Sequence, residues 1–544
     1  MKKPHILILI AIVALGAFLR FYDITEIPLG LYPDEAMNGN NALEVLATGN
    51  FKIFYPENNG REGLFINLQT ISLAIFGNEP WALRIVSALI GTLTILGLYL
   101  FTRELLLKFD FDNYRSRTSI GLLASFFLAT SYWHVNFSRI GFRAILVPFF
   151  ATFAMYFLLK GLRKGAILDL VLAGIFAGLG FHTYIAFRFM VFVFAVPIVW
   201  YIWRRKETAA ACLPCAILLF IFIAFIAALP LGVYFVQHPA EFLNRAGDIS
   251  IFSAASPVKE FGKSLISTLG MFFVRGDCNW RHTFNCQPAL HPLIALFFIL
   301  GLFFLIRSAK QYSLQAAILL AWFFALMLPA VLTREGLPHA LRSIGMIPPV
   351  MILAAWGGTA SWDWIRNWLA AQRSKFPQDA PQLHRIQKEF ALLAVLILLT
   401  LPFMTYHAYF QRWAQHPQTY EAFDTSIWHL GQFLASTPQD ITKHVVVNTK
   451  GVIVRGIPMP AETVMFASDS FTPEERTAKN IQYIAAADPS ERGAAPDMIA
   501  VRPAEKTIIA FLDGSDSALI RAFQEKYPEL KIRVPGDFVI LQNY

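Results

Sequence analysis

Two adjacent acids, Asp34 and Glu35, follow the first apolar segment of the chain, in the sequence Tyr32-Pro33-Asp34-Glu35. A carboxylate can take a proton from a hydroxyl group, and partial removal from water makes it a stronger base. The pair could therefore supply general-base chemistry beside a membrane. The structural alternative is that Asp34 caps a helix running to Thr48 and that Glu35 lies in its first turn, where the helix dipole favours an acid. The spacing of the two acids leaves both interpretations open.

Arginines gather at the ends of apolar segments that we assign to the outer side of a membrane. Arginine binds phosphate oxygens through two parallel hydrogen bonds, and charged groups near hydrocarbon usually face a cavity or a partner. For any single arginine, an ion pair or a side chain that reaches the interface is the alternative. The gathering of several arginines on one side indicates a binding site for a phosphate group. The candidate residues are Arg61, Arg139, Arg143, Arg188 and Arg342.

Other side chains in the same connections are candidate contacts to a sugar or an acceptor. Trp280 could stack on a sugar ring, although aromatic residues also collect at membrane interfaces without any such role. The candidates are Tyr32, His182, Trp280, Arg281 and His282. No compact group of His, Cys, Asp and Glu has metal-ligand spacing, so we expect no metal site and no cofactor. The proposed chemistry neither requires nor forbids a divalent metal.

These residues must be positioned by membrane helices. Hydrophobic residues make up 56% of the 544 positions and charged residues only 15%, against about a quarter in soluble proteins. Apolar runs of about 16 to 25 residues can cross a bilayer, and no basic tail or stripe suggests nucleic acid. We expect an all-α polytopic core with about eleven spans, at residues 5–22, 81–101, 118–133, 144–160, 166–182, 186–203, 211–236, 289–306, 313–332, 344–360 and 389–408.

The apolar segment 64–76 decides the topology. If it lies at the interface rather than spanning, all short basic connections fall on one side, as the positive-inside rule requires. The N-terminus is then cytoplasmic, and the residues after about 408 are extracytoplasmic. The basic connections are Arg103–Arg117, Lys160–Lys164, Arg204–Lys206, Arg307–Lys310 and Trp364–Lys388.

The composition becomes polar after the last span. We therefore divide the chain into a membrane core (1–408), whose first outer loop (23–80) holds the two acids, and a soluble domain (409–544). Short β-rich runs in that domain alternate with helical stretches such as Ser517–Lys526, which predicts a small α/β domain.

Four cysteines are too few for a disulfide scaffold. Cys278 and Cys286 lie in one polar loop, where a disulfide is plausible in an oxidising compartment. Cys212 and Cys215 lie in an apolar segment, where we expect them to pack as unpaired residues.

At the first outer loop the chain resembles the family 39 glycosyltransferases, which include protein O-mannosyltransferases and the bacterial aminoarabinose transferase. The resemblance is strongest over residues 5–110. The segments that carry it are Pro33-Asp34-Glu35, Gly60-Arg61-Glu62-Gly63-Leu64-Phe65 and Glu79-Pro80-Trp81-Ala82-Leu83-Arg84. It implies a GT-C fold in a cell membrane, a sugar donor linked to a polyprenyl phosphate, and transfer with inversion on the extracytoplasmic face.

The resemblance also implies roles for individual residues. Asp34 would deprotonate the acceptor, which could be a protein, a lipid or a glycan. Glu35 would support the site or contact the acceptor. Arg61 stands where many members have a lysine before two prolines, and Arg-Glu-Gly replaces that pattern.

The main alternative function is a transporter or flippase of a lipid-linked or anionic solute, which would also use outer arginines. It predicts acids and interrupted helices near the middle of the spans, whereas the acids of this chain gather in one outer loop.

Overall fold

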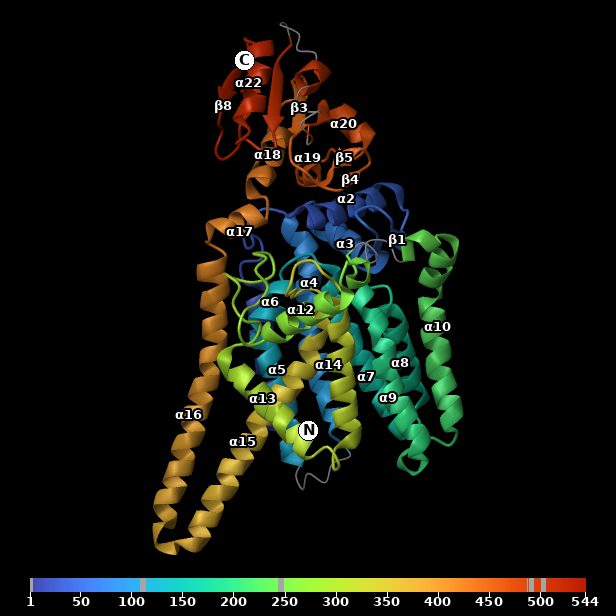
Figure 1. Ribbon diagram of the computed structural model, residues 1–544, viewed down its shortest axis with the longest axis vertical. Helices are drawn as coiled ribbons and strands as arrows, with labels where there is room; N and C mark the ends of the chain where they lie inside the picture. The colour runs from blue at the N-terminus through green and yellow to red at the C-terminus, as the bar shows by residue number, and fades with distance from the viewer. Residues whose placement is uncertain (1–2, 108–113, 243–248, 487, 489–493, 500–504) are drawn as a thin grey trace. The chain divides into compact units, whose positions relative to one another are not determined.

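The computed structural model describes residues 3–107, 114–242, 249–486, 488, 494–499 and 505–544 (Figure 1). Contacts divide the chain into two compact units. The helical unit comprises Met1–Tyr22 and Ser87–Trp413, and the mixed unit comprises Asp23–Val86 and Ala414–Tyr544. We had expected residues 23–80 to belong with the membrane core. By contacts, this loop instead folds together with the C-terminal residues.

Each of the eleven expected spans coincides with a helix, and the fold class is confirmed. The helices are α1 (Lys3–Phe21), α4 (Pro80–Leu105), α5 (Tyr114–Thr130), α7 (Leu146–Lys164), α8 (Ile167–Gly180), α9 (Met190–Trp203), α10 (Leu213–Gln237), α13 (Pro292–Arg307), α14 (Ser313–Val331), α15 (Ile347–Lys375) and α16 (Ala380–Tyr406).

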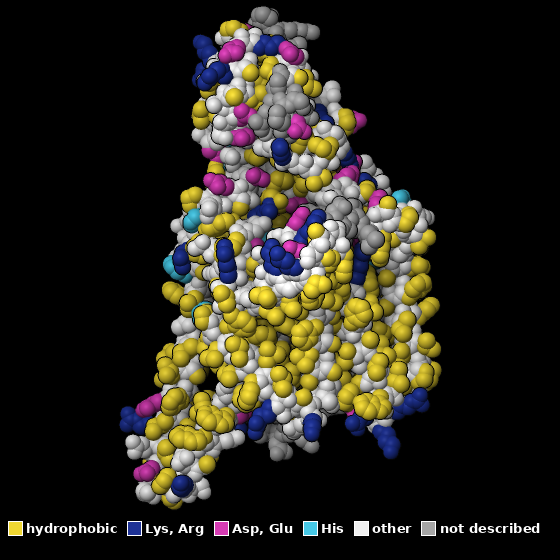
Figure 2. Space-filling model, viewed as in Figure 1, with side chains coloured by type: hydrophobic (Ala, Val, Ile, Leu, Met, Phe, Trp, Pro, Cys, Tyr) yellow, Lys and Arg dark blue, Asp and Glu magenta, His cyan; other side chains and the backbone are white. Residues whose placement is uncertain are grey.

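The helical unit is that of a multi-pass membrane protein. In the described part of the chain, eight helices are long and apolar enough to cross a bilayer, and α5, α8 and α13 are shorter apolar helices. Most side chains of α10 and α16 face outward although they are apolar, as Leu218 and Phe222 show with 65% and 59% exposure. Figure 2 shows apolar side chains covering the helical unit in a broad band, with Lys and Arg at both of its edges. Such an apolar exterior suits lipid, where the backbone groups of each helix are satisfied internally.

Short elements connect these helices and carry several candidate residues. They are α6 (Tyr132–Phe137), η1 (Arg143–Ile145), η2 (Ile185–Phe189), η3 (Arg205–Glu207), η4 (Ile251–Ser253), α12 (Pro257–Gly270), η5 (Ile344–Met346), η6 (Pro377–Asp379) and the π-helix η7 (His407–Trp413).

The mixed unit contains a five-stranded sheet in the order β6-β3-β7-β9-β8. Strand β3 pairs in parallel with β6 and β7, and β9 pairs antiparallel with β7 and β8. The strands are β3 (Thr442–Val447), β6 (Ile481–Ala485), β7 (Thr507–Phe511), β8 (Lys531–Arg533) and β9 (Ile540–Gln542).

Side chains alternate between the two faces of this sheet, as the strand period of two requires. Val445 and Val447 pack on one face with residues of α18 (Thr425–Ser436) and α19 (Glu462–Ser468). Val446 packs on the other face with Leu519 and Phe523 of α22 (Ser517–Lys526). The expected α/β domain and its helix at Ser517–Lys526 are therefore present. Its remaining elements are α17 (Pro417–Ala422), β4 (Ile453–Val454), β5 (Ile457–Pro458), η8 (Met459–Ala461), α20 (Pro473–Lys479) and η9 (Ala495–Met498).

The first outer loop folds around a buried helix, α2 (Pro33–Thr48). Its apolar side chains join one core with residues of α3 (Gly63–Phe76), the start of α4, and Phe466 of α19. A Cβ atom at Gly39 would lie 2.4 Å from the Phe466 ring, so glycine permits this close approach. A hairpin of β1 (Phe54–Tyr55) and β2 (Arg61–Glu62) connects α2 to α3. The segment 64–76, which decided the expected topology, thus forms α3 and packs against α2.

Both cysteine pairs form disulfides. The Cys278–Cys286 bond agrees with expectation. The expectation of unpaired cysteines at 212 and 215 is wrong, because α10 begins at Leu213 and Cys212 lies before the helix with extended backbone. Its side chain can therefore turn back to Cys215, with 5.2 Å between the two Cα atoms.

Candidate functional site

The N-terminus of α2 presents the predicted base. Tyr32 is the N-cap, Pro33 opens the helix, and Asp34 and Glu35 lie in the first turn. The alternative that Asp34 caps the helix is therefore wrong by position, because the fixed φ of Pro33 starts the helix two residues earlier than an Asp34 cap would. Asp34 is partly exposed, and Asn58 Nδ2 donates a hydrogen bond of 2.6 Å to its Oδ1. Asn58 had not been singled out from the sequence.

Glu35 points in the opposite sense, into the core of the mixed unit. Its carboxylate forms a two-bond ion pair with Arg84, with Nε–Oε1 at 3.0 Å and Nη2–Oε2 at 3.1 Å. The side chains of Glu35 and Arg84 are 0% and 1% exposed. Arg84 also donates to the carbonyl oxygens of Pro28 and Gly30. This geometry makes Glu35 the residue that holds α2 to the start of α4, in line with a supporting role.

Arg61 is buried as well, at 2% exposure. Its Nη1 and Nη2 atoms donate to the side-chain oxygens of Asn38 (2.7 Å) and Asn41 (2.5 Å), both on α2. Its guanidinium carbon lies 5.9 Å from the centre of the Tyr55 ring. These bonds fix the β1–β2 hairpin against α2. Phosphate binding by Arg61 stays a prediction.

A second buried acid, Glu462, contacts α2 from the C-terminal part of the chain. Asn40 Nδ2 donates to Glu462 Oε2 at 2.7 Å and to its backbone oxygen at 3.0 Å. Burial raises the pKa of Glu462 from 4.5 to about 7. No sequence pattern indicates this contact, because 422 positions separate the two residues.

The candidate arginines of the helical unit lie in different surroundings. Arg139 is fully buried, donates to the backbone oxygen of Arg20 at 2.9 Å, and packs over the rings of Tyr409 and Phe410. Arg20 is also fully buried and donates to Ser138 Oγ at 3.2 Å. The two arginines thus fasten α1 to the segment after α6, which is a structural arrangement.

Arg143, Arg188 and Arg342 are only partly buried. Arg143 lies over the Tyr184 ring, and Arg188 lies over the Phe242 ring, with 5.4 and 4.4 Å to the ring centres. Arg342 donates to Thr333 Oγ1 at 2.8 Å within its own loop. These three remain candidates for phosphate.

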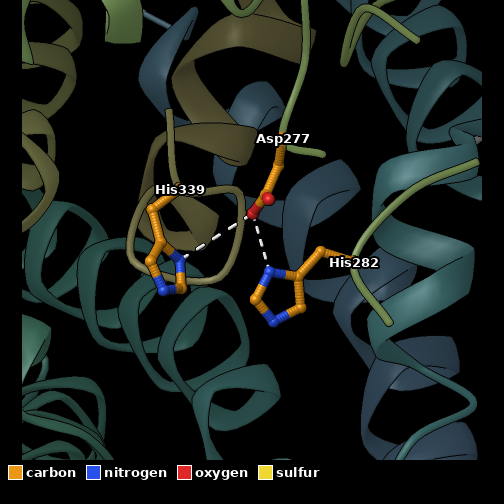
Figure 3. A group of neighbouring side chains, drawn as sticks. All are labelled: Asp277, His282 and His339. Carbon is orange, nitrogen blue, oxygen red and sulfur yellow. Dashed lines mark hydrogen bonds and ion pairs between the residues drawn. The ribbon is translucent and has the colours of Figure 1, made fainter. Parts of the chain in front are cut away.

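The other candidates of the helical unit lie in two places. His182 Nε2 is 2.9 Å from the Ala227 oxygen of α10, so it links the turn after α8 to α10. Trp280, Arg281 and His282 share one loop, whose backbone oxygens accept hydrogen bonds from neighbouring side chains. Among the described residues, His282 also belongs to a group whose ligand atoms are close enough to hold a metal ion, with Asp277 and His339 (Figure 3).

Comparison with known proteins confirms the resemblance to family 39 glycosyltransferases. The family model described as dolichyl-phosphate-mannose-protein mannosyltransferase matches residues 64–234. A Bacillus subtilis (strain 168) protein named "Putative mannosyltransferase YkcB" is 27% identical over 199 residues, which are 35% of this chain and 25% of that protein. The chain therefore matches about a quarter of this relative's length. The family match begins after Asp34, Glu35 and Arg61.

Solved structures share the fold across the whole chain. ArnT from Cupriavidus metallidurans, bound to undecaprenyl phosphate, superposes with a TM-score of 0.56 at 13% identity and covers 100% of this chain and 99% of that one. AglB from Archaeoglobus fulgidus, in complex with an inhibitory peptide and a dolichol-phosphate, has a TM-score of 0.50 at 15% identity and covers 100% and 74%. The expected GT-C fold is therefore present.

Proposed function

We propose that this protein is a membrane glycosyltransferase that moves a sugar from a polyprenyl-phosphate donor to an acceptor hydroxyl, with inversion, and that Asp34 is the general base. The observation that carries the assignment is the contrast between two neighbouring acids. Glu35 is fully buried with both oxygens on Arg84, whereas Asp34 is partly exposed and receives a hydrogen bond from Asn58 at one oxygen.

The proposed reaction needs one carboxylate base. Asp34 takes the proton of the acceptor hydroxyl while the acceptor oxygen bonds to the anomeric carbon of the donor sugar. The bond between that carbon and the phosphate oxygen breaks, and polyprenyl phosphate leaves with the electron pair. The carboxyl proton then passes to water. Because phosphate is already a stable leaving group, no second carboxylate is required, in contrast to inverting hydrolysis of a glycosidic bond.

The surroundings of Asp34 support this role. The helix that carries it is buried and is held by Arg61 through two asparagines and by Arg84 through Glu35. A base acts well only when its position is fixed to within fractions of an ångström. Asn58 restrains one oxygen of Asp34 in the same way. We further propose that Arg143, Arg188 and Arg342 are the donor-phosphate candidates, because they are less buried than Arg61 and Arg139.

The proposed orientation puts the N-terminus in the cytoplasm and residues after about 408 outside. It is supported by the basic connections between helices, such as Arg204–Lys206 after α9 and Arg307–Lys310 at the end of α13.

The test is sugar transfer by the purified full-length protein, with a panel of radiolabelled polyprenyl-phosphate sugars and several acceptors. Asp34→Asn should lower kcat by about 10²- to 10⁴-fold, the usual contribution of a general base, while donor binding is retained. Glu26→Gln is the matched control, because Glu26 is an exposed acid of the same loop, and it should transfer at the wild-type rate.

Equal kcat in Asp34→Asn and wild type would remove Asp34 from the chemistry. Absence of transfer from every donor by folded wild-type protein would refute the glycosyltransferase assignment and favour a transporter of a lipid-linked or anionic solute.

A further inference from the structure

Three side chains from two loops of the helical unit converge on one point. Asp277 and His282 lie in the loop between α12 and α13, and His339 lies in the loop between α14 and α15. The Nδ1 atom of His282 is 2.6 Å from Asp277 Oδ2, and that of His339 is 3.9 Å from the same oxygen. Both imidazole rings turn Nδ1 toward the carboxylate (Figure 3). The three ligand atoms all lie within 4.8 Å of one another.

We infer that Asp277, His282 and His339 bind a divalent transition-metal ion of the Zn²⁺ class. Two imidazoles and one carboxylate are the donor set that Zn²⁺ takes when it keeps an open fourth position. In a tetrahedral site with bonds of about 2.0 to 2.2 Å, ligand atoms stand about 3.3 Å apart. The two separations from Asp277 Oδ2 lie on either side of this value and differ from it by less than 1 Å.

The burial of the Asp277 carboxylate also supports a cation at this point. The carboxylate is 6% exposed, and no lysine or arginine of the described chain lies within ion-pair distance of it. Its oxygens accept hydrogen bonds from the backbone N–H groups of Asn279 and Ala340, at 2.9 and 2.8 Å, and His282 Nδ1 lies at hydrogen-bond distance from Oδ2, at 2.6 Å. A buried anion is costly unless it is paired. A metal ion bound by the two histidines would place a positive charge directly beside this carboxylate.

The surroundings hold the three ligands in place. Asn136 of α6 donates to the backbone oxygen of His282 at 3.0 Å, and the Phe137 ring packs against the His282 ring. The Cys278–Cys286 disulfide closes the loop directly after Asp277. Metal sites depend on such support to orient their ligands. An ion at this point would join two loops that carry Arg281 and Arg342.

Our expectation of no metal site is thus replaced by a specific candidate. No compact sequence motif indicates these ligands, because they are separated by 5 and 57 positions (282 − 277 and 339 − 282). This inference concerns metal binding alone and does not depend on the sugar-transfer activity.

The test is metal binding by untagged full-length protein in detergent, stripped with a chelator and then titrated with Zn²⁺ or Co²⁺. We expect one ion per chain by mass spectrometry, a visible Co²⁺ spectrum of a four-coordinate site, and a higher Tm with metal. His339→Gln should weaken binding by at least about tenfold and abolish the rise in Tm, since even residues behind a ligand contribute that much. His407→Gln is the control, because His407 is exposed and lies on η7.

Asp277→Asn should behave as His339→Gln does. Should Asp277→Asn fail to fold, His339→Gln decides, because His339 makes the longer contact of 3.9 Å. The inference is overturned if folded wild-type protein binds no ion at saturating Zn²⁺, or if His339→Gln binds with wild-type affinity.

Discussion

Removing the charge of Glu35 should loosen α2 more than any comparable change on that helix. Glu35→Gln keeps the shape of the side chain and one acceptor oxygen but leaves the buried Arg84 guanidinium without its counter-charge. Breaking one partner of a buried pair costs about 3 to 5 kcal/mol. Arg84 keeps its hydrogen bonds to the carbonyls of Pro28 and Gly30, so we expect the lower end, about 3 kcal/mol.

The assay is amide hydrogen exchange of α2 in the full-length protein, which reports the free energy of local opening. A loss of about 3 kcal/mol corresponds to exchange faster by about 100-fold, since each factor of ten is about 1.4 kcal/mol. Glu44→Gln is the matched control on the same helix. Glu44 pairs with Arg455 at 2.9 Å, but its side chain is 22% exposed, so its loss should cost less than about 1 kcal/mol.

The reasoning is refuted if Glu35→Gln speeds exchange in α2 no more than Glu44→Gln does. A different outcome would also be informative. If Glu35 contacts the acceptor, Glu35→Gln should raise KM for the acceptor while exchange in α2 stays unchanged.

Two more predictions concern side chains that hold α2. The pKa of Glu462 is raised to about 7 in the folded protein, so the protein binds this proton more tightly than the unfolded chain does. The contribution of the protonated Glu462 carboxyl to the free energy of unfolding is therefore fully present below pH 4.5. This contribution falls by about 3 kcal/mol as the pH rises through 7. Glu462→Gln should remove this fall, as measured by exchange of α19 amides between pH 4 and 8, and equal pH dependence in both proteins would contradict the assignment. Arg61→Lys keeps the charge but cannot form the two hydrogen bonds to Asn38 and Asn41. It should therefore lower the free energy of local opening of the β1–β2 hairpin by about 1 to 2 kcal/mol. Hydrogen exchange of the hairpin amides measures this free energy. Wild-type protection in Arg61→Lys would show that the positive charge alone is enough to hold the hairpin against α2.

The sequence by itself determined the elements of this protein. Each expected span became a helix, because the length of an apolar run needed to cross a bilayer is a property of consecutive residues. The short β-rich runs that alternate with helical stretches after the last span likewise predicted the α/β fold that the described C-terminal residues adopt. The motif at Pro33 and Asp34 identified the loop of interest, whereas the start of α2 was expected at an Asp34 cap and lies at Pro33 instead.

Only the tertiary structure decided what each charged residue touches. Glu35 meets Arg84 across 49 positions, Asn40 meets Glu462 across 422, and Asp277 and His339 come from separate loops. It also decided that Asp34 is partly exposed and its neighbour Glu35 buried, although the two acids are adjacent. The physical reason is that burial and pairing depend on the packing of elements far apart in the chain, whereas helix length and hydrophobic pattern depend on neighbours.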